Sequence, residues 1–432
     1  MQPQKKRNII ACIIGNIIEW YEFTLFAYLA PVIATLFFPN ENHLLGLLST
    51  FLIFAVGFVI RPLGSIILGH LGDRLGRAKT LKLTILLISI ASIFTGLLPT
   101  YQQAGVWSPI LLAACRLIQG LCIGGEFAGT MIYLTETAES KRRAKISCMT
   151  NNGSNLGVLI AIGACAVFSS LLPNAIFLTY GWRILFVFGG VMGVIGLWLR
   201  RDITESEVFE QLKKKIQEKY LPIKFVLKYQ RATVAKIILL LFISACGSYV
   251  LMGYISTYLH VFVHTPLAKA YQIQTIFILI TLALVPMFAH LSDKYGRKNL
   301  LLFSSLGYLI CSVPVFYFLQ LVQAWWILLP LVVFYSAEQA VMPVTIVEMF
   351  PGIGRYTGIS IAYNLTMAVI GGTAAFTNTW LIAHFNNTLI IAYYIMFCAS
   401  VSLLITLFFL PKYYGVKHSL VEIQQMPLEP LN

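Results

Sequence analysis

The sequence predicts an all-α membrane protein with twelve transmembrane helices in two pseudo-symmetric six-helix bundles and both termini in the cytoplasm. The first observation behind this prediction is composition. Of the 432 residues, 58% are hydrophobic and 11% are charged, and the mean hydropathy is +0.79. A soluble protein has about a quarter of its residues charged. The other two observations are a repeated segment and the placement of basic residues.

A charged, glycine-containing segment occurs twice. Residues 69–81 have the sequence Gly-His-Leu-Gly-Asp-Arg-Leu-Gly-Arg-Ala-Lys-Thr-Leu, and residues 289–301 have Ala-His-Leu-Ser-Asp-Lys-Tyr-Gly-Arg-Lys-Asn-Leu-Leu. The copies are 220 residues apart, and each separates two long apolar runs. An offset of half the chain length indicates internal duplication.

Basic residues indicate which ends of the spans face the cytoplasm. Of the 31 Lys and Arg residues, 27 lie at the two termini or in alternate gaps between apolar runs. The positive-inside rule therefore places both termini in the cytoplasm. The net charge of +14 is better explained by a bilayer than by nucleic acid, because these residues do not share one polar face. The first apolar run lacks a small-residue cleavage site, so a removable signal peptide is not expected.

Apolar runs of about 20 residues are needed to cross a bilayer. The predicted spans are 9–37, 45–71, 81–99, 107–135, 146–172, 183–200, 233–263, 269–291, 299–320, 325–350, 357–384 and 388–410. A basic segment with acids at helical spacing separates the sixth and seventh spans and predicts an amphipathic linker on the membrane surface. The predicted units are an N-terminal bundle 1–200, a cytoplasmic linker 201–232, a C-terminal bundle 233–410 and a short cytoplasmic tail 411–432.

Four glutamates lie inside the predicted spans. Intramembrane charges are costly and indicate substrate or proton pathways. Glu19 lies about ten residues into the first span, roughly 15 Å deep at about 1.5 Å per residue. We expect Glu19, Glu22 and Glu126 to couple proton movement, and either of the first two can carry the coupled proton. The alternative is a protonated, hydrogen-bonded glutamate with a structural role.

Arg116 lies at a similar depth and is expected to meet Glu19 across the bundle. Its planar guanidinium can hold a substrate carboxylate in one protonation state and a glutamate in the other, or it can form a permanent pair that orients two helices. Aromatic faces attract ammonium groups. With Arg116, the residues expected to bind substrate are Asn16, Trp20, Phe23, Arg61, Tyr249, Tyr254 and Glu338.

Charged residues recur at matched positions on the predicted cytoplasmic side of both halves. We expect them to form a gate that holds the halves together while the cavity is open to the outside. The alternative is an ordinary positive-inside topology signal, which needs no paired acids or glycines at matched positions. The first set comprises Asp73, Arg77 and Glu136, with Arg142 or Arg143, and the second comprises Asp293, Arg297, Glu348 and Arg355.

The eight cysteines all lie in apolar runs without a C-x-x-C pair or a histidine cluster. This pattern predicts no disulfide framework, no metal site and no cofactor.

The repeated charged segment, placed between the second and third spans and again between the eighth and ninth, resembles that of the major facilitator superfamily. Five further motifs in order narrow the resemblance to the metabolite:proton symporter group. The motifs are Gly15-Asn16-Ile17-Ile18-Glu19-Trp20-Tyr21-Glu22-Phe23, Arg61-Pro62-Leu63-Gly64, Arg116-Leu117-Ile118-Gln119-Gly120 with Gly124-Gly125-Glu126, Tyr180-Gly181-Trp182-Arg183, and Glu348-Met349-Phe350-Pro351 with Arg355. The resemblance implies proton-coupled transport by alternating access. The group includes proline/betaine, α-ketoglutarate, citrate and shikimate transporters. Two features depart from it: Glu22 stands where the group usually has Asp, and the tail after Pro411 lacks the coiled coil of some osmosensing relatives.

The expected function is proton symport of a small zwitterionic osmolyte such as proline or glycine betaine across an inner membrane, by a monomer. One alternative is a dicarboxylate or α-keto acid symporter, in which Arg61 and Arg116 each bind one carboxylate. A more remote alternative is a non-transporting membrane sensor. An enzyme is not expected, because no nucleophile–base motif lies at a membrane face.

Overall fold

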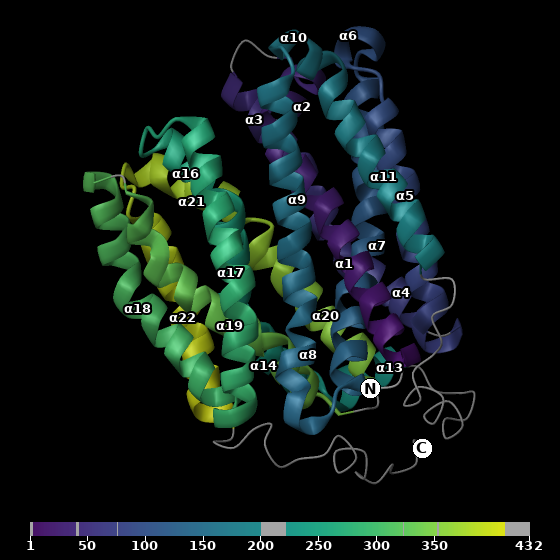
Figure 1. Cartoon of the computed structure of the whole chain (residues 1–432), viewed down its shortest axis with the longest axis vertical. Coiled ribbons are helices and arrows are strands. Elements are labelled where there is room, and N and C mark those ends of the chain that lie inside the picture. Colours follow the sequence, from purple (N-terminus) through teal and green to yellow (C-terminus); the bar gives the residue numbers. More distant parts are fainter. Residues whose placement is uncertain are drawn as a thin grey trace.

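The computed structural model describes six stretches of the chain, and all their regular elements are helices (Figure 1). The described residues are 3–39, 43–75, 77–199, 222–322, 324–351 and 354–410. Most of the predicted linker (201–221) and the whole predicted tail (411–432) lie outside these stretches. Within them, the predicted all-α fold is confirmed.

The N-terminal half consists of long helices joined by short ones. They are α1 (Pro3–Tyr28), α2 (Ala30–Phe37), α3 (His43–Val59), α4 (Arg61–Leu75), α5 (Arg77–Leu97), α6 (Tyr101–Ala104), α7 (Trp107–Thr137), η1 (Ser140–Arg142), α8 (Arg143–Ser147), α9 (Met149–Leu171), α10 (Asn174–Ile176), η2 (Phe177–Gly181) and α11 (Trp182–Leu199).

The C-terminal half follows α13 (Pro222–Tyr229), which falls inside the predicted linker. Its elements are α14 (Arg231–Leu240), α15 (Phe242–Cys246), η3 (Gly247–Tyr254), α16 (Ile255–Val261), α17 (Leu267–Tyr295), α18 (Arg297–Val322), η4 (Trp325–Leu328), α19 (Leu329–Met349), α20 (Arg355–Thr366), η5 (Met367–Gly371), α21 (Ala374–Phe385) and α22 (Ile390–Phe409). Of the short elements, η2, η3 and η5 are π-helical.

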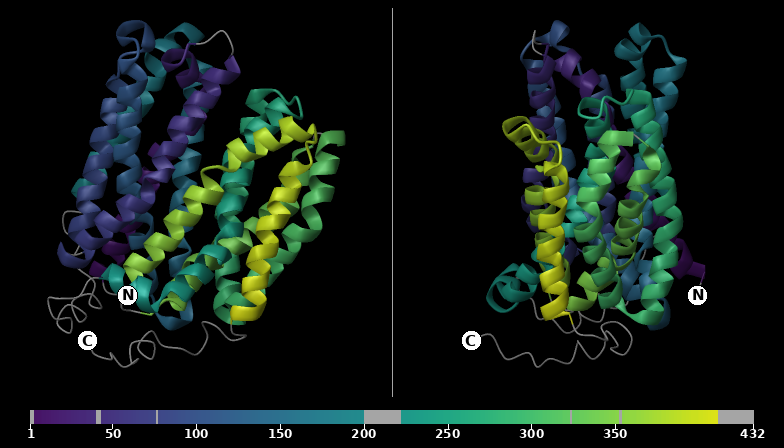
Figure 2. Two further views of the ribbon diagram at one scale, coloured as in Figure 1. Left: turned by 180° about the vertical axis from the view of Figure 1, so that it is seen from behind. Right: turned by 90° about the vertical axis from the view of Figure 1, so that its left-hand side faces the viewer.

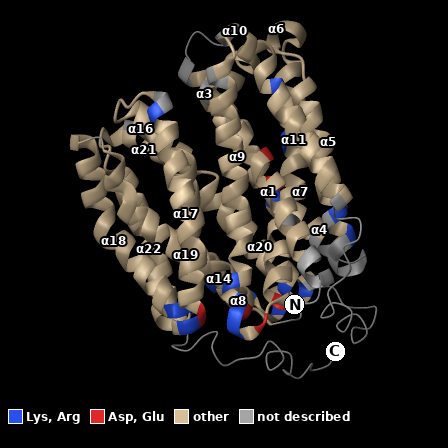
Figure 3. Ribbon diagram, viewed as in Figure 1, with Lys and Arg blue, Asp and Glu red and all other residues tan. Residues whose placement is uncertain are grey.

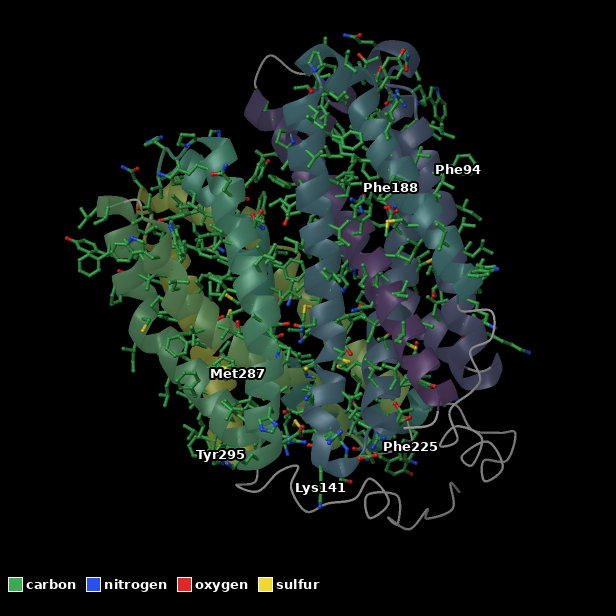
Figure 4. The ribbon with its side chains drawn as sticks, in the orientation of Figure 1. Phe94, Lys141, Phe188, Phe225, Met287 and Tyr295 are labelled. Carbon is green, nitrogen blue, oxygen red and sulfur yellow. The ribbon has the colours of Figure 1, made fainter. Side chains whose placement is uncertain are left out.

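Eleven helical segments among the described residues are long and apolar enough to cross a membrane. The predicted third span corresponds to a shorter apolar stretch, Lys82–Leu97, of the 21-residue helix α5. The total of twelve spans therefore stays a prediction. Large apolar side chains such as Phe94, Phe188 and Met287 are exposed on the helices, as expected for surfaces that face lipid (Figure 4).

The two halves meet most closely at one end of the molecule, where α1 begins and α22 ends, and diverge toward the opposite end (Figures 1 and 2). We call the first of these the terminal end. Within the N-terminal half, α1 packs on α9 and α11, and within the C-terminal half α17 packs on α19. Between the halves, α20 packs on α4 and α7, and α17 packs on α8 and α9.

Two glycines with positive φ set the starts of helices at the terminal end. Gly296 has φ 91° and Gly354 has φ 71°, a region that side chains with a Cβ rarely adopt. Each turn places an arginine, Arg297 or Arg355, at the first position of the following helix. Gly296 belongs to the second copy of the repeated segment, so this copy is a helix-reversing turn.

Candidate functional site

Glu22 and Arg116 lie together inside the N-terminal half, on α1 and α7. They are 1% and 3% exposed, and each acts electrostatically on the other. Neither carboxylate oxygen of Glu22 has a hydrogen-bond partner among the described residues. The Arg116 guanidinium lies 3.7 Å above the ring of Phe26 and donates from Nη1 to Gln119 Oε1 at 3.1 Å. The acid beside Arg116 is thus Glu22, one turn beyond the Glu19 that the sequence analysis expected there.

A glycine on α11 makes room for the Glu22 carboxyl group. A Cβ added to Gly189 would lie 1.9 Å from Glu22 Oε1 and 2.7 Å from the ring of Tyr21. The carboxyl group therefore points from α1 toward α11, into the N-terminal bundle rather than toward the other half.

Glu19 and Arg61 lie at the boundary between the halves. Glu19 is 2% exposed and Arg61 is 1% exposed, and both act electrostatically on Tyr249 and Tyr363 of the C-terminal half. The Arg61 guanidinium carbon lies 4.2 Å from the centre of the Phe58 ring, a cation–π contact. Close packing holds Arg61 in place, because a Cβ on Gly124 of α7 would lie 2.4 Å from the Arg61 carbonyl oxygen.

Aromatic rings connect the halves around these charges. Phe127 of α7 stacks on Tyr363 of α20 with ring centres 4.6 Å apart, and Phe58 of α3 contacts Tyr249 of η3 at 5.2 Å. Trp20 lies edge-on to Phe127 at 6.1 Å. Phe23, Trp20 and Tyr249 are thus grouped with Arg61 and Glu19 at the interface, and their role in binding stays a prediction.

Two predicted binding residues make contacts within their own half. Asn16 donates to the Thr150 carbonyl and to Ser154 Oγ of α9, at 2.5 and 2.9 Å. The Tyr254 hydroxyl lies 2.7 Å from Thr379 Oγ1 of α21. Their described polar contacts brace neighbouring helices.

Glu338 is fully buried in α19, within the C-terminal half. Its Oε2 accepts a bond from Gln339 Nε2 at 3.1 Å, and within the described part of the chain its Oε1 has no hydrogen-bond partner. The hydroxyls of Ser244 and Tyr308 also interact with it.

Charges gather at the terminal end, where ion pairs connect the two halves (Figure 3). Arg143 donates to Glu348 at 3.0 Å, and Arg355 donates to Glu136 at 3.0 Å. Arg297 also contacts Glu348, at 3.3 Å. All five side chains are at most 5% exposed. These pairs bring together residues from the two predicted gate sets.

Asp293 completes the terminal cluster. It accepts the backbone N–H groups of Ala144 and Lys145 in the first turn of α8, at 2.9 and 3.1 Å, and Arg297 contacts it at 3.1 Å. Between the two arginines that the sequence left as alternatives, Arg143 forms the ion pair, whereas Arg142 is exposed.

Three predicted residues cannot be placed in these contacts. The side chains of Asp73, Arg77 and Glu126 lie outside the part of the structure that is described.

Two asparagines that the sequence analysis did not single out also join the halves. Asn151 donates to the Gln339 carbonyl at 2.8 Å, and Asn152 donates to the Leu282 carbonyl at 3.2 Å. Each of these carbonyls lies four residues before a proline within its helix, Pro343 or Pro286. Because proline has no N–H, both carbonyls lack their helical donor. Two adjacent asparagines in one apolar span and a proline inside each of two other spans were the sequence features that could have predicted these contacts.

A helical membrane protein of two similar halves, with buried charges and ion pairs along their interface, belongs to the class of multi-pass membrane transporters. The sequence model of the Major Facilitator Superfamily matches residues 12–375, and the chain belongs to this family. Its members are transporters rather than enzymes.

Relatives cover nearly the whole chain. A putative proline/betaine transporter of Staphylococcus aureus (strain COL) is 31% identical over 409 residues, covering 93% of this chain and 88% of the relative. The proline/betaine transporter of Escherichia coli (strain K12) is 31% identical over 414 residues, covering 92% and 82%. Among solved structures, the proton:xylose symporter XylE bound to 6-bromo-6-deoxy-D-glucose matches with a TM-score of 0.79 at 17% identity, covering 97% of this chain and 98% of XylE.

Proposed function

We propose that this protein is a proton symporter that takes up a zwitterionic osmolyte, such as proline or glycine betaine, by alternating access in an inner membrane. The observation that supports this best is the cluster at the boundary between the halves, where one arginine, one glutamate and several aromatic rings lie together. Arg61 suits a substrate carboxylate, and Glu19 with the aromatic faces suits an ammonium group. The relatives described as proline/betaine transporters support the same class.

The terminal end is then the cytoplasmic end, and its ion pairs form the inner gate, which is closed in this conformation. Rocking of the two halves breaks these pairs and exposes the site to the cytoplasm.

Glu22 is the better candidate for the coupled proton. It lies inside the N-terminal half beside Arg116, and neither of its oxygens has a hydrogen-bond partner in the part of the chain that the structure describes. A carboxylate is attracted to Arg116, whereas a protonated carboxyl group releases this arginine. Glu19, at the interface, is then the acid that contacts the substrate.

The dicarboxylate alternative receives less support. It requires Arg61 and Arg116 each to bind one substrate carboxylate, but the described contacts of Arg116 are all with the N-terminal half. A single arginine at the interface suits a single carboxylate better.

Uptake into proteoliposomes under an imposed pH gradient tests substrate and coupling together. Labelled glycine betaine or proline should accumulate, and α-ketoglutarate and citrate should not. Uptake of the dicarboxylates alone contradicts the osmolyte assignment.

Substitutions at the two glutamates test which one carries the proton. Glu22→Gln should lower accumulation driven by the pH gradient and leave exchange of labelled for unlabelled substrate, because only the exchange needs no net proton transfer. Glu19→Gln should weaken binding, so that both assays fall together. The opposite pattern assigns the proton to Glu19.

A further inference from the structure

We propose that Glu338 is a second proton-binding site, located in the C-terminal half, and that its protonation is coupled to the contact between Gln339 and Asn151 that joins the halves. The proposal rests on the proposed symport function but concerns a residue on the other half from Glu22 and Arg116. It implies that two protons move with each substrate molecule.

The described surroundings of Glu338 include no partner cation. It is fully buried, and among the described residues no Lys, Arg or His forms an ion pair with it. A buried carboxylate without a cation is costly, so the neutral acid is a readily accessible state there. In contrast, the gate acids Glu136 and Glu348 each have an arginine within 3.3 Å and have no comparable reason to bind a proton.

The groups that face Glu338 can satisfy both of its protonation states. They are the Ser244 hydroxyl from α15, the Tyr308 hydroxyl from α18 and the Gln339 amide on its own helix, with Tyr335 nearby. A hydroxyl donates to a carboxylate and accepts from a carboxylic acid. Among the described residues the Tyr308 hydroxyl has no hydrogen-bond partner, so it is available to the Glu338 carboxyl group. On protonation one O–H bond forms on the Glu338 carboxyl group, and the reverse step returns the proton to water.

The position of Glu338 connects the proton to movement of the halves. Gln339 Nε2 donates both to Glu338 Oε2 and, at 3.2 Å, to Ser248 Oγ at the start of the π-helix η3. The Gln339 carbonyl, freed by Pro343, accepts Asn151 from the other half. Protonation of Glu338 weakens the hydrogen bond between its carboxyl group and the Gln339 side-chain amide. Because the Gln339 carbonyl accepts the bond from Asn151, a change at Gln339 also affects the contact between the halves.

A sodium ion is the competing occupant, because the Glu338 carboxylate and the hydroxyls of Ser244, Tyr308 and Tyr335 are oxygen ligands. One carboxylate oxygen is already occupied by an amide N–H, and the ring of Tyr335 lies against Gly247. The described oxygens therefore fall short of the six or so that a hard cation prefers, and the proton is favoured.

The proton-to-substrate ratio provides the test. With two protons, a gradient of one pH unit at zero membrane potential limits accumulation of a zwitterion to about 100-fold, and with one proton to about tenfold, because each tenfold step equals about 1.4 kcal/mol. The full chain in proteoliposomes should reach the higher limit, and Glu338→Gln should reach only the lower one. Glu338→Asp, which keeps an ionisable group, should restore the higher limit.

Other outcomes overturn the proposal. If the wild-type protein and Glu338→Gln share a tenfold limit, there is no second coupled proton, although the proposed symport stands. If no variant accumulates substrate under the gradient, the proposed function itself fails. If a sodium gradient drives uptake and Glu338→Gln abolishes this dependence, the site holds sodium.

A second measurement tests the proposal even if the Glu338→Gln variant does not transport substrate. Infrared difference spectra of purified protein between low and high pH should contain a carboxylic acid C=O band that is missing in Glu338→Gln. An unchanged set of bands contradicts the proposal.

Discussion

The Glu22 carboxyl group occupies space that Gly189 leaves empty on the neighbouring helix α11. Glu19 and Glu22 are three residues apart, so they share one broad face of α1. Their environments nevertheless differ, because Glu22 meets α7 and α11 of its own half whereas Glu19 meets aromatic residues of the other half. The different roles proposed for the two acids follow from this difference in orientation.

Gly189→Ala should disrupt the proton site. The new Cβ would lie 1.9 Å from Glu22 Oε1, so either the carboxyl group or α11 must move. Overpacking of this kind costs about 1–3 kcal/mol. We expect a lower thermal midpoint in detergent and accumulation reduced toward the level of Glu22→Gln.

Gly163→Ala is the matched control. Nothing lies within 4 Å of a Cβ at this position of α9, and replacing an interior helical glycine with alanine is worth up to about 1 kcal/mol of added stability. Its midpoint and transport should equal or exceed those of the wild type. Equal losses in both variants would contradict the packing argument.

On the scale of helices, the sequence predicted most of the elements but not how they face one another. Apolar length and the repeated segment were enough for the all-α fold and most spans, because bilayer thickness imposes helix length. The rotation of each helix about its axis depends on which residues it packs against, as at Gly189 and Gly124. The spacing of residues along the sequence does not identify these packing partners. For this reason the sequence identified Arg116 as important but paired it with Glu19, and it overlooked Asn151 and Asn152.

The contact between Asn151 and the proline-freed carbonyl predicts a thermodynamic coupling. Asn151→Ala should destabilise the closed terminal end by about 1 kcal/mol, since it leaves the Gln339 carbonyl without a donor. In a Pro343→Ala background the new backbone N–H of residue 343 can donate to the Gln339 carbonyl. Asn151→Ala should then destabilise the closed terminal end by less than it does in the wild type. Spin labels at Lys141 and Tyr295, on opposite halves at the terminal end, report the closed population (Figure 4).

The control for this cycle uses the other proline. Asn151 and Pro286 do not share a carbonyl, so Asn151→Ala and Pro286→Ala should have additive effects on the measured distances. Asn152→Ala with Pro286→Ala should be coupled in the same way as the first pair. Additivity in all combinations would mean that the asparagines do not depend on the proline-freed carbonyls.

At the scale of the whole molecule, the terminal end combines three kinds of contact between the halves. Ion pairs involve Glu136 and Glu348, Asp293 accepts backbone N–H groups of α8, and the asparagine bonds lie further along the interface. The sequence identified most of these charges from their matched positions in the two repeats. It could not assign their partners, because duplication predicts similar halves but does not say which residues meet between them.

A charge swap tests whether the pair between the halves, rather than the number of charges, holds the terminal end closed. Glu136 and Arg355 are 2% and 1% exposed and are 3.0 Å apart. Breaking a buried pair from one side costs about 3–5 kcal/mol.

Glu136→Arg alone and Arg355→Glu alone should each shift the spin-label distances toward the open population and slow exchange. The double variant again pairs an acid with an arginine, and the number of basic residues at the terminal end is unchanged. It should therefore recover much of the closed population. Arg355 also donates to the Phe350 carbonyl at 3.0 Å, so recovery should be incomplete. If the double variant is as open as the sum of the single ones, these residues act only as topology signals.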